Sequence, residues 1–290
     1  MAMENLMEGI GISAVTVNTG REKIQAVKWF RIFHRTALGL MFLGTVSLFL
    51  WAIVGQAQEV EQMVGRVLGT YPHDPAAFTQ GLLYNQGKLY ESTGMYGQSQ
   101  IREVEIVSGN VLRSLSLSIE HFGEGLALVD NRLIQLTWRE HIAHVYDRDT
   151  FEKIGEFRYT GEGWGLCYDG TYLIMSNGSN RLFLRDPNTF EDRGSVAVTL
   201  YGQPLRNLNE LEFVNGFVYA NIFNQETIAQ IDPKSGRVTG VINAAGLLTP
   251  EEKKSAGVLN GIAFNPIKQT FYITGKNWPK IFEVTFETAR

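Results

Sequence analysis

Residues 122–128 read FGEGLAL, and the part from Glu124 to Leu128 has four counterparts elsewhere in the chain. Each begins with a polar or aromatic residue, usually continues with glycine, and then alternates in apolar residues. The five segments are QGLLY at 80–84, EGLAL at 124–128, WGLCY at 164–168, NELEF at 209–213 and NGIAF at 260–264. Their second positions lie 40 to 51 residues apart, a period typical of propeller blades with about four short strands each.

Turn sequences divide each repeat into short strands. Hairpins between the first and second strands are predicted at 85–87, 130–131, 169–170 and 215–216. Hairpins between the third and fourth strands are predicted at 108–110, 186–188 and 232–236. After Val60, the one candidate helix is Thr249 to Ser255, where Thr249, Pro250 and Glu251 resemble a helix start.

The last repeat leaves room for only three strands before Arg290, whereas a strand over Val64 to Thr70 has no repeat of its own. We expect that strand to supply the missing outer strand, because closure of the ring covers exposed strand edges. The sequence therefore predicts an all-β fold. The predicted fold is a five-bladed β-propeller over residues 63–290, closed by an N-terminal strand and preceded by one N-terminal hydrophobic helix.

The composition indicates a folded domain and excludes several classes of protein. Of 290 residues, 44% are hydrophobic and 19% are charged, with a net charge of −4. This excludes a disordered chain and argues against binding to nucleic acid. The single cysteine, Cys167, excludes an intramolecular disulfide.

An uncharged run of 18 residues, Ala37 to Val54, lies near the N-terminus. Its length is at the lower limit for a membrane-spanning helix and above that of a usual signal-peptide core. Lys28, Arg31 and Arg35 precede the run. Positive charge on this side favours a cytoplasmic N-terminus and export of the rest of the chain.

Two main alternatives follow for residues 37–57, which are either a retained transmembrane anchor or a signal cleaved after Ala57. A third alternative, a buried core helix, is disfavoured by the basic flank and by the lack of a polar face. Residues 1–36 are interpreted as a flexible extension. Either of the two main alternatives predicts an exported protein, periplasmic or extracellular, that contacts the membrane only through this segment. No long apolar edge strand is evident, so we expect a monomer.

The first residue of each repeat is expected at one mouth of the central channel, where the innermost strands begin. These residues are Gln80, Glu124, Trp164, Asn209 and Asn260, and none is aliphatic. The ends of the second strands add Trp138, Asn177, Phe223 and Lys276. Polar groups that converge between aromatic walls indicate a pocket. The alternatives are packing between blades for the aromatic residues and ordered water for the polar ones.

Glu124 is the candidate acid or base of this pocket. It stands between Gly123 and Gly125 at the mouth of an apolar channel. A partly desolvated carboxyl has a raised pKa and suits proton transfer near neutral pH. Glu91 is a weaker candidate that is better explained as a residue at a blade edge.

Several motifs, in order, closely resemble the plant- and bacterial-type glutaminyl-peptide cyclotransferases, or glutamine cyclotransferases. They are PHD at 72–74, FTQGL at 78–82, YESTGMYG at 90–97, FGEGL at 122–126, NELE at 209–212, LNGIA at 259–263 and TGKNWPK at 274–280. The resemblance extends from about Tyr71 to Phe286. It implies a five-bladed propeller, in agreement with the number of repeats.

The resemblance also implies an enzyme that converts an N-terminal glutamine of a peptide or protein into pyroglutamate, with release of ammonia and without a metal or other cofactor. It implies Glu124 as the general acid and base. The implied substrate-binding residues are Phe78, Gln80, Phe122, Trp138, Trp164, Asn209, Phe223 and Lys276. Lys276 is expected either to stabilise the tetrahedral oxyanion or to bind the peptide.

Phe223 departs from the family pattern, which usually has a tryptophan there. An aromatic wall is retained, but an indole N–H donor is lost, so affinity or substrate preference is expected to differ.

Two other functions stay open at the level of sequence. A non-catalytic propeller binds a partner on its faces, but it does not need Glu124 or the pair Trp138 and Trp164. A lactonase-like propeller hydrolase would hold a metal ion in the channel, for which Glu124, Asn209 and Asn260 offer ligands.

Overall fold

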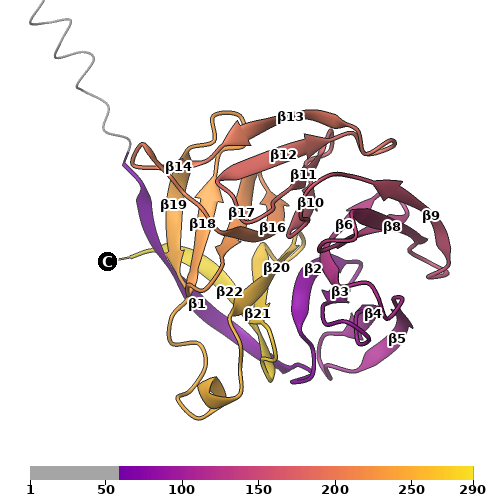
Figure 1. Cartoon of the computed structure of the whole chain (residues 1–290). Coiled ribbons are helices and arrows are strands. Elements are labelled where there is room, and N and C mark those ends of the chain that lie inside the picture. The colour runs from indigo at the N-terminus through magenta and orange to yellow at the C-terminus, as the bar shows by residue number, and fades with distance from the viewer. Residues whose placement is uncertain (1–58, 290) are drawn as a thin grey trace, which may run out of the picture. The chain divides into compact units, whose positions relative to one another are not determined.

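The computed structural model describes residues 59–289, in which nearly all regular structure is β-strand (Figure 1). The predicted flexible extension at 1–36 and the hydrophobic segment at 37–57 lie outside the described residues. Within residues 59–289, no helix has the length and apolar character required to cross a bilayer. The all-β, propeller-like fold expected from the sequence is confirmed.

Four-stranded antiparallel units follow one another along the chain and surround a common centre (Figure 1). The first contains β2 (Thr79–Asn85), β3 (Lys88–Thr93), β4 (Gln100–Glu105) and β5 (Val111–Ser116). The second contains β6 (Gly123–Val129), β7 (Arg132–Thr137), β8 (Ile142–Asp147) and β9 (Lys153–Arg158). The third contains β10 (Leu166–Tyr168), β11 (Leu173–Met175), β12 (Arg181–Arg185) and β13 (Asp192–Ala197).

An eight-stranded sheet completes the fold and consists of two such units joined edge to edge. One is β16 (Leu208–Val214), β17 (Phe217–Ile222), β18 (Thr227–Ile231) and β19 (Val238–Asn243). The other is β20 (Leu259–Asn265), β21 (Thr270–Gly275), β22 (Lys280–Thr288) and β1 (Glu61–Pro72). A small hairpin of β14 (Thr199–Leu200) and β15 (Gln203–Pro204) precedes β16.

Strand β1 closes the structure, as the sequence predicts, and is longer than the expected 64–70. It pairs antiparallel with β22, from Met63 opposite Thr288 to Pro72 opposite Lys280. Its beginning also pairs in parallel with β19, which the sequence does not indicate. The parallel contact is close because Met63 packs over Gly240, where a Cβ would lie 2.3 Å from the Met63 side chain.

The innermost strands approach one another so closely that side chains are excluded between them. Strands β2, β6, β10, β16 and β20 contact one another in this order, and β20 contacts β2. A Cβ on Gly81 or Gly125 would lie 2.5 Å from a backbone nitrogen of the next strand, and one on Gly165 would lie 2.1 Å from the Asn209 carbonyl oxygen. This explains why glycine is usual at the second position of the repeat.

A β-bulge interrupts the ladder at the same place in four innermost strands. The register shifts at Thr79/Gly81, Gly123/Leu126, Leu208/Leu211 and Leu259/Ile262. Each bulge contains the first residue of a repeat, which thereby leaves the alternation of the strand. Bulges redirect side chains in this way, and here they direct the polar residues to the mouth of the channel.

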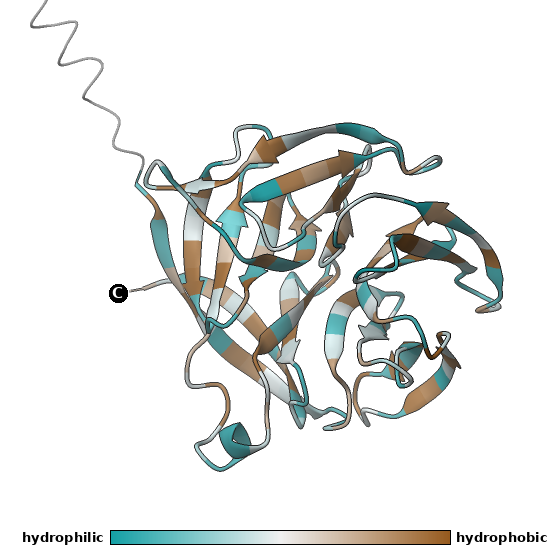
Figure 2. Ribbon diagram, in the orientation of Figure 1, coloured by the Kyte–Doolittle hydropathy of each residue, from teal (hydrophilic) through white to brown (hydrophobic). Residues whose placement is uncertain are grey.

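The local turns largely follow the sequence. Gln86, Asp130 and Asn215 have φ values of 49°, 54° and 50°, as type I′ hairpins require. The possible helix over Thr249–Ser255 is a single 3₁₀ turn, η1 (Glu252–Lys254). None of its residues is buried, and it is hydrophilic in Figure 2. It thus lacks the apolar face that would stabilise a longer helix.

A buried ion pair connects the first unit to the closing one, just after β1. The Nε2 atom of His73 lies 3.0 Å from Oε1 of Glu91, and the Thr79 hydroxyl donates to the same oxygen at 2.7 Å. The Nδ1 atom of His73 lies 2.8 Å from the carbonyl oxygen of Trp278. Glu91 is only 1% exposed, so its place is in this cluster and not in the pocket described below.

Each partner of this pair favours the charged form of the other. Burial by itself would lower the pKa of His73, but the charge and hydrogen bond of Glu91 and the Trp278 carbonyl raise it above 6.5. Burial by itself would raise the pKa of Glu91, but His73, Arg102 and Thr79 lower it below 4.5.

Glu91→Gln is expected to reduce the free energy of unfolding by about 3–5 kcal/mol, because it leaves the His73 charge buried without a partner. Urea unfolding at pH 6 measures the change. Glu287→Gln is the matched control, since it breaks the exposed Arg66–Glu287 pair of the same closing strands and should cost less than about 1 kcal/mol. Equal losses in the two variants would contradict the buried role.

The same pair makes this contribution depend on pH. The lowered pKa of Glu91 gives stability that is present above pH 4.5 and is lost as the pH falls. The raised pKa of His73 gives stability that is present below pH 6.5 and is lost as the pH rises. The difference between wild type and Glu91→Gln should therefore be largest between these two values.

Candidate active site

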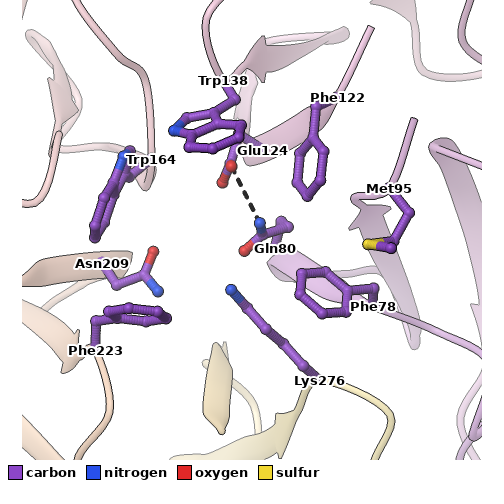
Figure 3. A pocket seen from close by; sticks show the side chains of 10 residues that line it. All are labelled: Phe78, Gln80, Met95, Phe122, Glu124, Trp138, Trp164, Asn209, Phe223 and Lys276. Carbon is purple, nitrogen blue, oxygen red and sulfur yellow. Dashed lines mark hydrogen bonds between the residues drawn. The ribbon is translucent and has the colours of Figure 1, made fainter. Parts of the chain in front are cut away.

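A pocket of about 310 Å³ opens at the channel mouth (Figure 3). All nine site residues implied by the sequence line it: Phe78, Gln80, Phe122, Glu124, Trp138, Trp164, Asn209, Phe223 and Lys276. Met95 also lines it. The structure therefore brings together residues that are up to 198 positions apart in the chain.

Two sets of positions build this pocket. Gln80, Glu124 and Asn209 lie at the bulges of β2, β6 and β16, and Trp164 lies two residues before the start of β10. Trp138, Phe223 and Lys276 directly follow the second strands β7, β17 and β21. The bulges supply most of the polar floor, and the ends of the second strands supply the surrounding wall (Figure 3).

Glu124 is held at the floor of the pocket by a short chain of amides. Its side chain is buried, with 4% exposure, and Oε1 accepts a hydrogen bond from Gln80 Nε2 at 3.1 Å. Gln80 Oε1 accepts in turn from Asn260 Nδ2 at 3.2 Å, and the same nitrogen donates to the Thr79 carbonyl at 2.9 Å. Asn260 thus lies behind the pocket and fixes the orientation of Gln80.

The protonation of Glu124 is set mainly by its burial. Burial raises the pKa of the Glu124 carboxyl well above 4.5. The Lys276 ammonium opposes this rise in pKa, and the negative charges of Glu162 and Glu140 add to it. A carboxyl with a raised pKa exchanges protons readily near neutral pH.

Lys276 brings a cation into the same pocket. Its Nζ lies 4.7 Å from the ring centre of Phe78 and 5.3 Å from that of Phe223, distances at which an aromatic face attracts a cation. Burial lowers the pKa of Lys276 below 10.5, and the charge of Glu124 partly offsets this. In Figure 3 the ammonium points toward the centre of the pocket.

Aromatic rings form most of the wall. Phe122 lies 6.1 Å from Phe78 and 5.6 Å from Trp138 between ring centres, and Trp164 lies 5.6 Å from Phe223. The Phe122 ring is seated over Gly94, where a Cβ would lie 2.3 Å from the ring. Phe223 keeps the edge-to-face contact with Trp164, so the wall is continuous on this side.

Asn177 does not reach the pocket, contrary to the expectation for the end of a second strand. Its Oδ1 accepts hydrogen bonds from the backbone and hydroxyl of Ser179 at 3.2 and 2.7 Å. The Trp164 ring occupies the space above Gly178, where a Cβ would lie 2.6 Å from the ring. Asn177 therefore shapes a turn beneath Trp164.

Met95 is the lining residue that sequence reasoning missed. It follows β3 with a φ of 90° and 42% exposure. It belongs to YESTGMYG, one of the motifs that carry the family resemblance. That motif is the feature of the sequence that could have identified Met95 as a pocket residue. Periodicity does not reveal it, because it lies in a loop with a left-handed backbone.

The metal cage considered from the sequence can be compared with the side chains at the channel mouth. Among residues 59–289 there is no group of three or more His, Cys, Asp or Glu side chains placed to hold a metal ion. Of the three residues considered for a metal cage, Glu124 and Asn209 line the pocket and Asn260 lies behind Gln80.

Comparisons with known proteins agree on one family. A family model described as glutamine cyclotransferase matches residues 42–286. A glutaminyl-peptide cyclotransferase of Arabidopsis thaliana is 39% identical over 228 residues, which cover 77% of this chain and 71% of that protein. The crystal structure of Myxococcus xanthus glutaminyl cyclase is also 39% identical, with a TM-score of 0.73, and the match covers 80% of this chain and 100% of that one.

Lys276→Met is expected to raise the pKa of Glu124 further, because it removes a positive charge that favours the carboxylate. The measurement is an NMR titration of side-chain carboxyl carbons, with Glu124→Gln used to assign the signal. Lys253→Met removes a charge from the exposed pair with Glu226 and serves as the control. An unchanged or lower pKa in Lys276→Met would refute the coupling.

Proposed function

The chain belongs to the glutamine cyclotransferase family, and we propose that Glu124 carries the proton in the reaction that it catalyses. The protein is a glutaminyl-peptide cyclotransferase, which converts the N-terminal glutamine of a peptide into pyroglutamate and releases ammonia. The observation that supports the role of Glu124 is its position as a buried carboxyl, oriented by Gln80, in a pocket walled by aromatic rings.

The chemistry suits a single carboxyl group. The α-nitrogen of the substrate bonds to its own side-chain amide carbon, and the bond from that carbon to the amide nitrogen breaks. The attacking nitrogen loses a proton, which Glu124 accepts, and the leaving nitrogen gains one, which Glu124 returns. Burial raises the pKa of Glu124, and a raised pKa suits a carboxyl that must both accept and return a proton.

The rest of the pocket positions the substrate. Nucleophile and electrophile belong to one residue, so the enzyme mainly has to hold that residue in a geometry that closes the ring. We assign this task to the aromatic wall. Gln80 donates one N–H to Glu124, which leaves its second N–H for a substrate carbonyl. The buried amide of Asn209 is the other polar contact offered to the peptide.

Lys276 is assigned to the tetrahedral intermediate. Its ammonium points into a pocket of low polarity, where a fixed cation stabilises developing negative charge more strongly than in water. Phe78 and Phe223 hold the ammonium by their ring faces. Phe223, which replaces the usual tryptophan of the family, thus keeps both an aromatic wall and a cation contact.

We also propose that the five four-stranded units are the five blades of a closed propeller. The ring of contacts among the five innermost strands and the pairing of β1 with β22 support this number. For residues 37–57 we propose an export segment, anchor or cleaved signal, on the basis of its uncharged run and preceding basic residues. We propose a monomer as the active form.

Glu124→Gln is expected to lower kcat by roughly 10²- to 10⁴-fold, the usual contribution of a general acid and base. The assay measures ammonia released from a Gln-initiated peptide by the full chain, and mass spectrometry follows the loss of one ammonia from the peptide. Glu156→Gln, an exposed residue of β9, is the control and should keep the wild-type rate. A kcat for Glu124→Gln equal to that of the wild type would refute the role of Glu124 as proton carrier.

The same assay separates this mechanism from a metal-dependent hydrolase. A chelator should leave the wild-type rate unchanged if Glu124 and Lys276 carry the chemistry. Loss of activity with the chelator, and its return on addition of metal, would favour the lactonase-like alternative.

Lys276→Ala is expected to lower kcat more than it raises KM, because an oxyanion contact is stronger in the transition state than in the bound substrate. A loss of roughly 10²- to 10³-fold in kcat is the scale for a lost oxyanion contact. Steady-state kinetics with one Gln-initiated peptide measure both constants. An increase in KM at constant kcat would instead assign Lys276 to peptide binding.

A further inference from the structure

One carboxylate outside the pocket, that of Glu162, contacts two of the pocket's aromatic walls. Its Oε2 accepts hydrogen bonds from Nε1 of Trp138 at 2.8 Å and from Nε1 of Trp164 at 3.0 Å. Glu162 lies between β9 and β10 and is not among the lining residues. Trp138 follows a strand of the second unit and Trp164 precedes the first strand of the third. A single anion therefore connects two units at the mouth.

The arrangement determines which parts of the two indoles face the pocket. In Figure 3 the nitrogen atoms of Trp138 and Trp164 lie on facing edges of the two rings, on the side away from Lys276. Both N–H groups are engaged by Glu162. The pocket consequently receives the apolar faces of these rings, and their N–H groups are not offered to a substrate.

Arg139 completes the cluster on the outer side. Its Nε donates to Glu162 Oε1 at 3.0 Å, and its guanidinium carbon lies 3.6 Å from the centre of the Trp138 ring. Burial opposes ionisation of Glu162, but the hydrogen bonds from Trp164, Trp138 and Arg139 lower its pKa below 4.5. The carboxylate is thus charged, and hydrogen bonds to a charged acceptor are the strong ones.

We propose that Glu162 is a positioning residue for substrate recognition, which fixes Trp138 and Trp164 at the separation that admits the N-terminal glutamine. This inference rests on the proposed function, since it takes the two rings as walls of the substrate pocket. Glu162 acts through the indoles and does not touch the substrate. Its negative charge has a second effect, because it adds to the rise of the Glu124 pKa.

Glu162→Ala, which removes the acceptor for both indoles, is expected to lower kcat/KM for a Gln-initiated peptide by roughly ten- to a hundredfold. This is the scale for losing hydrogen bonds to a charged group. Most of the loss should appear in KM, because the walls bind substrate while Glu124 performs the chemistry. Glu162→Gln keeps an acceptor oxygen without the charge and should fall between wild type and Glu162→Ala.

Glu140→Ala is the matched control. Glu140 also raises the pKa of Glu124, but it accepts hydrogen bonds from the Tyr96 hydroxyl and the Phe122 backbone and not from an indole. Both alanine variants should move the limb of the pH–rate profile set by Glu124 to lower pH. Only Glu162→Ala should also change tryptophan fluorescence and raise KM by tenfold or more.

A double-mutant cycle decides whether the effect passes through the indoles. Trp138→Phe with Trp164→Phe keeps two rings and removes both N–H donors. In that background, Glu162→Ala should change KM by less than about twofold. An undiminished effect there, or an unchanged KM for Glu162→Ala alone, would overturn the proposal. If Glu162→Ala does not fold, the KM of Glu162→Gln is compared in the wild type and in the Trp138→Phe/Trp164→Phe background, and the same criteria apply.

The wild-type protein separates failure of this inference from failure of the proposed function. Wild-type protein that releases no ammonia from any Gln-initiated peptide would refute the function itself. Active wild-type protein whose KM does not respond to substitution of Glu162 would refute the positioning role alone.

Discussion

The innermost strands lie so close together that their backbones leave no room for a side chain between them. At the second position of the repeat, a Cβ on Gly81 or Gly125 would lie 2.5 Å from a backbone atom of the neighbouring strand, so any side chain there would force the ring apart. Direct contact of the backbones makes the channel narrow. Because the second residue of the repeat has no room for a side chain, the first residue reaches the mouth of the channel through a bulge. The polar floor of the pocket thus follows from the packing of the ring.

The fourth repeat shows the same constraint in another form, because it has Glu210 where the other four have glycine. The Glu210 carboxylate accepts hydrogen bonds from the backbone nitrogens of Leu82 and Ile262, at 3.2 and 2.9 Å. It therefore joins three innermost strands through hydrogen bonds. Burial raises the pKa of Glu210 well above 4.5, as does the nearby Glu212, and the two backbone bonds oppose the rise.

Electrostatics in the pocket follows from the same enclosure. Glu124 and Lys276 are both buried. Burial raises the pKa of Glu124 and lowers the pKa of Lys276, so it favours the neutral form of each group. Each charge in turn moderates the shift of the other. The Gln80 amide contacts Glu124, and aromatic faces contact Lys276, at positions with little exposure to solvent. Electrostatic effects on a reaction are stronger in such an enclosed site than in water.

The sequence predicted the architecture because repeats spaced 40 to 51 residues apart form similar units. Equivalent residues of the repeats therefore occupy equivalent places around the centre. That periodicity indicated the propeller-like architecture, the closing strand and the residues at the channel mouth. The family resemblance indicated the activity and nine of the ten residues that line the pocket. Tertiary structure alone decided what depends on contacts between distant segments. Asn177 is turned away because the Trp164 ring covers Gly178, Glu91 is paired with His73, and Glu162 engages two indoles from different units. Such contacts depend on where rings and carboxylates come to lie after packing, which local spacing does not encode.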